Sequence, residues 1–175
     1  LSSSVGVEVH DFTLGGTATQ VENVIARLPG SRHPEELVIV GGHYDSRQQN
    51  INDPSQSPGA EDNASGCAGV LEAARVFSAY PPQRTMVFVC FAGEEQGLYG
   101  GTAYAQSLQA SGTMANIELA IIMDMIGYSG DADLDVLLET SSGLSTLFPV
   151  FTAAAATYAP ELRLISDTSY CCSDH

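Results

Sequence analysis

Several residues that can bind a metal ion follow apolar runs with the character of buried strands. These are His43, Glu94 with Glu95, and Asp124, and a fourth segment adds Asp62, which precedes a predicted helix. Because function collects at the carboxyl ends of strands in an open α/β sheet, we expect these side chains to converge. Crowded carboxylates repel one another and are costly to bury, and a divalent cation removes both problems. A histidine among carboxylates suits zinc, with cobalt or manganese as alternatives.

The spacing of these residues also predicts their roles. His43 and Asp45 are two residues apart, so at the end of a strand they point to the same side. Asp45 can then accept the second ring N–H of His43 and orient the imidazole. Glu94 and Glu95 are adjacent and diverge if the backbone is extended, so one can bind metal while the other faces the substrate. A free carboxylate beside a metal centre is the arrangement that general-base hydrolysis needs.

Each of these residues also has an ordinary structural explanation. A histidine after a strand is often a hydrogen-bonded turn residue, and adjacent glutamates are often a solvated pair. Asp62 and Asn63 together resemble a helix cap. All of these explanations would have to coincide at strand ends, so a shared metal site is the stronger interpretation.

The elements that would position the site alternate along the chain. Strands are expected over 5–12, 20–28, 36–42, 84–91, 119–123, 133–140 and 161–165, and helices over 64–80, 100–111 and 143–158. The order predicts an α/β fold: a mixed sheet with a parallel centre, an antiparallel N-terminal hairpin and helices on both faces. No internal repeat or domain boundary is evident, so residues 1–175 are expected to form a single domain. The long polar loop 44–61 is expected to be functional.

The charge balance excludes some partners. The chain has 175 residues, with 21 Asp and Glu against 6 Lys and Arg. Such a chain cannot neutralise a row of phosphates, so neither a nucleic acid nor an anionic membrane surface is an expected partner. No apolar run approaches the ~18 residues of a membrane span.

Six segments carry a resemblance to a known family. They are Gln20–Gly30, Gly42–Ser46, Pro58–Gly66, Phe91–Gly100, Met123–Gly127 and Ser173–His175. In this order and across nearly the whole chain, they resemble the M28 family of zinc peptidases, in particular its bacterial leucyl-aminopeptidase-like group. The resemblance implies a three-layer sandwich of the zinc-exopeptidase type. It also implies a location that is secreted or extracytoplasmic.

The resemblance implies a role for each site residue. His43 and Asp124 would bind one Zn²⁺, Glu95 would bind a second, and Asp62 would bridge the two. Glu94 would be the general base, and Asp45 the residue that orients His43. The pocket for the first side chain of the substrate would be lined by Met125, with Tyr170 as a second candidate. The family also has a cis peptide bond after the bridging aspartate.

The implied reaction is hydrolysis of the N-terminal peptide bond of peptides or proteins. Two zinc ions would activate a bridging water, Glu94 would take its proton, and the same proton would later reach the leaving amine. The substrate would need a free N-terminus, which the acidic pocket would favour. Apolar first residues would be preferred.

The chain also departs from the family pattern. Relatives carry two spaced cysteines before Ser-Asp-His, whereas Cys171 and Cys172 are adjacent, so we expect that bridge to be absent; a vicinal bridge would be strained. Cys67 and Cys90 are expected to be core residues. The second zinc lacks one ligand here, and we do not expect His175 to supply it. The chain is therefore expected to be a domain incomplete at both ends, truncated before the final metal-ligand loop.

Three other functions fit the same fold. A glutaminyl cyclase uses a single zinc for acyl transfer, but residues 61–66 and 96–99 are more like those of the peptidases. A carboxypeptidase of the same family would need a basic pocket, and basic residues are scarce. A non-catalytic binding module would have lost its metal ligands. Here all the visible metal ligands and the general base are present.

Overall fold

The computed structural model describes residues 5–48, 57–128, 130, 133–169 and 171–174. The chain divides into two compact units, one of residues 1–127 with 173–175 and the other of residues 128–172. That residues 1–175 act as a single domain remains a prediction. Among the described helices, none has the length and apolar character needed to cross a membrane.

The larger unit is built on a five-stranded mixed sheet with the order β1-β2-β4-β3-β5. Its strands are β1 (Gly6–Thr13), β2 (Gln20–Leu28), β3 (His33–His43), β4 (Arg84–Phe91) and β5 (Ile117–Ile122). β1 and β2 form the antiparallel hairpin, and β2 is antiparallel to β4. β3 runs parallel to both β4 and β5. The predicted α/β class, with its parallel centre, is confirmed.

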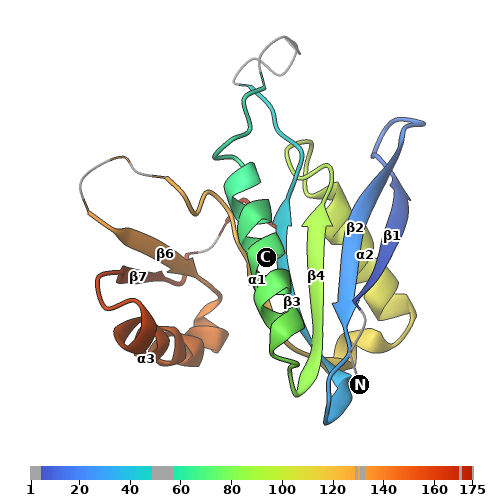
Figure 1. Cartoon of the computed structure of the whole chain (residues 1–175). Coiled ribbons are helices and arrows are strands. Elements are labelled where there is room, and N and C mark those ends of the chain that lie inside the picture. The colour runs from blue at the N-terminus through green and yellow to red at the C-terminus, as the bar shows by residue number, and fades with distance from the viewer. Residues whose placement is uncertain (1–4, 49–56, 129, 131–132, 170, 175) are drawn as a thin grey trace. The chain divides into compact units, whose positions relative to one another are not determined.

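Helices cover both faces of this sheet. Figure 1 shows α1 (Ala64–Ala79) and α2 (Tyr99–Ala110) on opposite sides of the strands. Alternate residues of β4 enter separate cores: Met86 and Phe88 pack on the α1 side, and Val87 and Val89 on the α2 side. This alternation explains why the central strands are apolar throughout. A short 3-10 helix, η1 (Thr113–Asn116), leads into β5.

The ends of the elements follow from local chemistry. The side chain of Asn63 accepts the backbone N–H of Gly66 at 2.9 Å and so caps α1, as predicted. α1 ends at Ala79, before two prolines. β3 begins at His33, earlier than the predicted residue 36, because the β3–β4 register shifts between His33 and Leu37 and the strand continues past the irregularity.

The smaller unit contains a strand–helix–strand motif. β6 (Asp135–Glu139) pairs in parallel with β7 (Arg163–Asp167), and η2 (Ser142–Leu147) with α3 (Phe148–Tyr158) connects them. The predicted helix 143–158 is therefore a 3-10 segment followed by an α-helix. Cys171 and Cys172 form a vicinal disulfide with Cα atoms 3.7 Å apart. The spaced bridge that the family resemblance implied is absent, as expected, and a vicinal bridge is present.

Candidate metal centre

The imidazole of His43 lies at the end of β3, where carboxylates from three other segments meet it. Its side chain is 1% exposed, and Nε2 lies 3.2 Å from Oδ1 of Asp62 and 3.6 Å from Oδ1 of Asp124. Oε2 of Glu94 lies 3.8 Å from the same nitrogen. The potential ligand atoms of His43, Glu94 and Asp124 all lie within 4.8 Å of one another. The structure thus gathers residues that are far apart in the sequence at one edge of the sheet.

Asp45 contributes to the site in a way that differs from the expected one. The backbone carbonyl of Asp45 lies 3.0 Å from Nδ1 of His43, whereas the nearer carboxylate oxygen is 3.6 Å away. The carboxylate instead accepts the backbone N–H groups of Glu94 and Glu95, each at 3.1 Å. The Asp45 carboxylate therefore binds two amide donors of the loop after β4, and the Asp45 backbone carbonyl orients the His43 imidazole.

The two adjacent glutamates diverge, as their spacing predicts. Glu94 faces His43, whereas Glu95 is held by Arg47, with 2.6 Å between Nε and Oε2. The backbone N–H of Arg47 also donates to Oε1 of Glu95 at 3.1 Å. The Glu95 side chain is 3% exposed, so Arg47 compensates a buried charge. Sequence reasoning missed Arg47, although it is the only basic residue of the loop 44–61.

The electrostatics of the site reflect a cation among acids. Burial lowers the pKa of His43, but Asp124, Asp45 and Glu94 outweigh this effect and raise it to about 11. Burial raises the pKa of Glu94 to about 7, and acidic neighbours add to the shift. Burial likewise raises the pKa of Asp174 to about 6. A divalent cation would relieve this crowding of negative charge, and imidazole nitrogen with carboxylate oxygens is a donor set that zinc accepts.

A buried asparagine of β2 positions the loop that carries both glutamates. Asn23 is 0% exposed, accepts the backbone N–H of Ala92 at 2.9 Å and donates to the carbonyl of Gly100 at 2.9 Å. A side chain at Gly100 would collide with the Ala92 carbonyl, so the two ends of the loop approach closely only because this residue is glycine. Alternation along β2 indicates a strand but carries no signal for these non-local bonds.

Asn63 connects the start of α1 to the end of β5. Besides capping α1, its side chain donates to the Met123 carbonyl at 2.9 Å and accepts the Met125 N–H at 3.2 Å. The peptide bond between Asp62 and Asn63 is cis, as the family resemblance implied. Met125 has a φ of 48° and is 45% exposed. Tyr170 and His175 lie outside the described residues.

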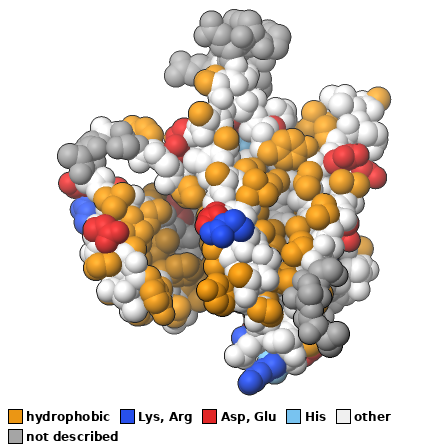
Figure 2. Space-filling model, viewed as in Figure 1, with side chains coloured by type: hydrophobic (Ala, Val, Ile, Leu, Met, Phe, Trp, Pro, Cys, Tyr) orange, Lys and Arg blue, Asp and Glu red, His pale blue; other side chains and the backbone are white. Residues whose placement is uncertain are grey.

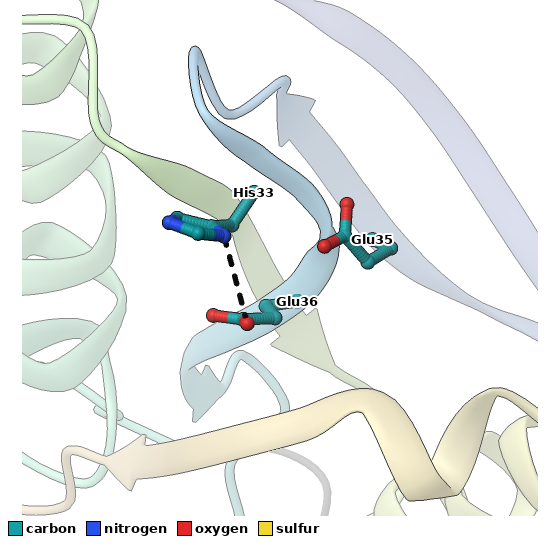
Figure 3. A group of neighbouring side chains, drawn as sticks. All are labelled: His33, Glu35 and Glu36. Atoms are coloured by element: carbon teal, nitrogen blue, oxygen red, sulfur yellow. Dashed lines mark ion pairs between the residues drawn. The ribbon is translucent and has the colours of Figure 1, made fainter.

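A second group of potential ligands lies at the opposite end of β3. Figure 3 shows His33, Glu35 and Glu36, with Nδ1 of His33 3.7 Å from Oε1 of Glu36. Arg84 already neutralises Glu36, with 2.5 Å between Nε and Oε2. His33 and Glu35 are exposed to solvent. The group at His43 is therefore the better candidate for a metal centre.

Comparisons with known proteins agree on the kind of protein. The model of "Peptidase family M28" matches residues 23–175. A protein of Pyrenophora teres f. teres named "Probable zinc metalloprotease" is 45% identical over 114 residues, which are 65% of this chain and 24% of that protein. This chain therefore spans about a quarter of the length of that relative.

Two solved structures show the same fold. A zinc aminopeptidase from Bacillus subtilis superposes with a TM-score of 0.75 at 31% identity, covering 91% of this chain and 37% of that one. A glutaminyl cyclase from an Acidobacteriales bacterium also gives a TM-score of 0.75, at 24% identity, covering 97% and 59% of the two chains. The second similarity concerns the fold alone.

Proposed function

The chain belongs to peptidase family M28, and we propose that it carries the metal centre of a zinc aminopeptidase. The observation that supports this most is the buried Nε2 of His43, which has carboxylate oxygens of Asp62, Asp124 and Glu94 within 3.8 Å. These three carboxylates come from different segments, so the fold has to assemble them. An enzyme that hydrolyses peptides with bound metal requires such an assembly.

The residues present divide between two proposed zinc ions. His43, Asp62 and Asp124 would hold the first ion, and Asp62 with Glu95 would hold the second, to which we assign no further ligand. Zinc, when bound, would polarise the scissile carbonyl and make water a better nucleophile. Arg47 would have to leave the carboxylate of Glu95 before that carboxylate could bind metal.

Glu94 has the properties of a general base. Its side chain is 10% exposed, and burial raises its pKa to about 7 in the metal-free protein. A carboxylate with such a pKa can take a proton from water and later return it to the leaving amine near neutral pH. The hydrogen bonds from the backbone N–H groups of Glu94 and Glu95 to Asp45 keep this part of the loop in place.

The charge of the site supports a substrate with a free amino terminus. Asp62, Glu94 and Asp124 surround His43, and the arginine that the structure places there, Arg47, is already paired with Glu95. A cationic α-amino group is therefore favoured over a terminal carboxylate. The proposed substrates are peptides with a free N-terminus and an apolar first residue, next to Met125, and the proposed location is outside the cytoplasm.

The test is the hydrolysis of leucyl-p-nitroanilide by the full-length, zinc-loaded protein. We expect turnover that stops with chelators and returns with zinc, and no hydrolysis of the N-acetylated substrate. The Glu94→Gln variant is the matched control and is expected to be inactive. Cyclisation of a glutaminyl peptide, or release of a C-terminal residue from a blocked peptide, in place of leucyl hydrolysis would overturn the proposal.

A further inference from the structure

Two free cysteines lie together directly behind His43. Cys67 is in the first turn of α1 and Cys90 is near the end of β4, and both are partly buried. The Sγ atom of Cys67 lies 3.1 Å from the carbonyl oxygen of His43 and 3.8 Å from that of Gly42. Gly42 is the residue of β3 that pairs with Cys90 in the parallel ladder. Cys90 therefore lies on the strand next to the residue whose carbonyl oxygen Cys67 contacts.

The close approach of the thiols follows from two glycines. A Cβ at Gly42 would lie 2.9 Å from the Met123 carbonyl oxygen and 3.3 Å from the backbone of Gly66. Because both positions lack side chains, the first turn of α1 rests directly on β3. Cys67 then lies against the Gly42 carbonyl, and Cys90, on the neighbouring strand, packs against the core on the α1 side.

The thiol pair lies beside an exposed part of the sheet. Val24, which pairs with Cys90 from β2, is 43% exposed, and Tyr44 is 48% exposed. Leu71, one turn after Cys67, is 66% exposed. Figure 2 shows hydrophobic side chains uncovered on the face that carries α1. Both thiols are themselves only partly buried, so a small oxidant can reach them in this chain.

We propose that Cys67 and Cys90 form an oxidisable dithiol site, which small disulfides such as glutathione disulfide convert to an intramolecular disulfide. One cysteine thiolate attacks a sulfur of the oxidant, whose S–S bond breaks and releases one small thiol. The other cysteine then attacks the mixed disulfide and releases the second small thiol. Two electrons and two protons pass from the cysteines to the oxidant, and one Sγ–Sγ bond forms.

Oxidation would affect the metal centre through the backbone of His43. The thiol of Cys67 donates to the His43 carbonyl, and a disulfide sulfur has no hydrogen to donate. The loss of one hydrogen bond that supports a ligand corresponds to a change of roughly two- to tenfold in affinity. We therefore expect the oxidised protein to bind zinc that much more weakly. This effect rests on the proposed function, whereas disulfide formation does not.

The test of the dithiol is peptide mapping of the full-length protein after incubation with glutathione disulfide. Remaining thiols are blocked with N-ethylmaleimide before digestion, and the peptides are identified by mass spectrometry. We expect a cross-linked peptide that joins Cys67 to Cys90 and disappears on reduction. The Cys67→Ala and Cys90→Ala variants should instead carry glutathione on the cysteine that remains. Recovery of both cysteines as separate blocked or glutathionylated peptides from the wild type would overturn the proposal.

A second measurement tests the link to His43. The zinc affinity of the reduced and oxidised protein is measured by competition with a chromogenic chelator, with Cys171→Ser/Cys172→Ser as background to exclude the vicinal disulfide. Weaker binding after oxidation, restored by reduction, supports the link, and equal affinity refutes it. If the reduced protein binds no zinc, the proposed function fails. The peptide mapping still tests whether Cys67 and Cys90 form a disulfide.

Discussion

The side-chain carboxylate of Asp45 accepts the backbone N–H of Glu94, with 3.1 Å between Oδ1 and the nitrogen. The other carboxylate oxygen binds the next N–H along the chain in the same way. In the Asp45→Asn variant, one acceptor becomes an NH₂ group that faces an amide donor. We expect about 10- to 100-fold lower turnover and roughly 1–3 kcal/mol lower stability. Steady-state kinetics and urea unfolding provide the measurements.

A control for this variant is Glu72→Gln, which removes an exposed ion pair with Arg75 on α1. No measurable change is expected, because exposed pairs contribute little. Wild-type kinetics for Asp45→Asn would show that the two hydrogen bonds do not position the glutamates.

The divergence of the two glutamates predicts different losses on neutralisation. Glu94→Gln should keep its zinc and lose about 10²–10⁴-fold in turnover, because only a free carboxylate can transfer the proton. Glu95→Gln should lose zinc from the second site. Elemental analysis of dialysed protein, together with kinetics, separates the two effects. If Glu94→Gln lost zinc and Glu95→Gln kept it, the two roles would be reversed.

The contact between Arg47 and Glu95 predicts that metal and guanidinium compete. Arg47→Gln removes the cation that neutralises a carboxylate of 3% exposure. The metal-free variant should be less stable than the wild type, and it should bind the second zinc more tightly. Thermal unfolding with chelator and zinc titration of the full-length protein measure these changes. Arg75→Gln, at an exposed position of α1, is the control, and identical zinc curves for Arg47→Gln and wild type would contradict the prediction.

The raised pKa values predict how stability depends on pH. Folding raises the pKa of Glu94 to about 7 and that of Asp174 to about 6, so these groups bind protons more tightly in the folded state. Their contribution is fully present below the unfolded values near 4 and is lost as pH rises through 6 to 7. The pKa of His43 is raised to about 11, so its contribution to stability also decreases as the pH rises above 6.5. The pKa of Asp45 is lowered, so its contribution to stability is lost only in more acidic solution, as the pH falls.

We therefore expect the metal-free protein to lose about 1–3 kcal/mol of unfolding free energy between pH 5 and pH 8. Urea unfolding in the presence of a chelator measures this change. Glu94→Gln should flatten the dependence because it removes one of the titrating groups. Stability that stays constant or rises over this range would refute the assignment of these shifts.

The bonds of Asn63 predict a large effect of a single amide. The Asn63→Ala variant loses the cap of α1 and two bonds to the end of β5, and should lose about 2–3 kcal/mol of stability. Asn116→Ala changes an exposed asparagine at the end of η1 and should stay within about 0.5 kcal/mol of wild type. Chemical denaturation compares the variants. Equal losses for both would show that the buried bonds contribute nothing specific.

The sequence predicts the strands and helices well because hydrophobic periodicity and stop signals are local. β2 and β4 begin and end at the predicted residues, and α1 ends one residue early. The convergence of carboxylates on His43 could also be predicted from the sequence, because the strand ends of one sheet share an edge. The contacts of Asn23, Arg47 and the Asp45 carboxylate were not. Each depends on backbone groups or charges from distant segments, and no spacing rule describes them.

The two bonds of Asn23 have a consequence for the smallest functional piece of this fold. β2 supplies no candidate ligand, yet its single amide ties the beginning of the loop 92–100 to its end. A fragment that starts after β2 would retain every proposed ligand and the proposed base. Its two glutamates, however, would lie on a loop that lacks both hydrogen bonds from Asn23. The N-terminal hairpin is therefore as much a part of the proposed metal centre as the residues that would bind the metal.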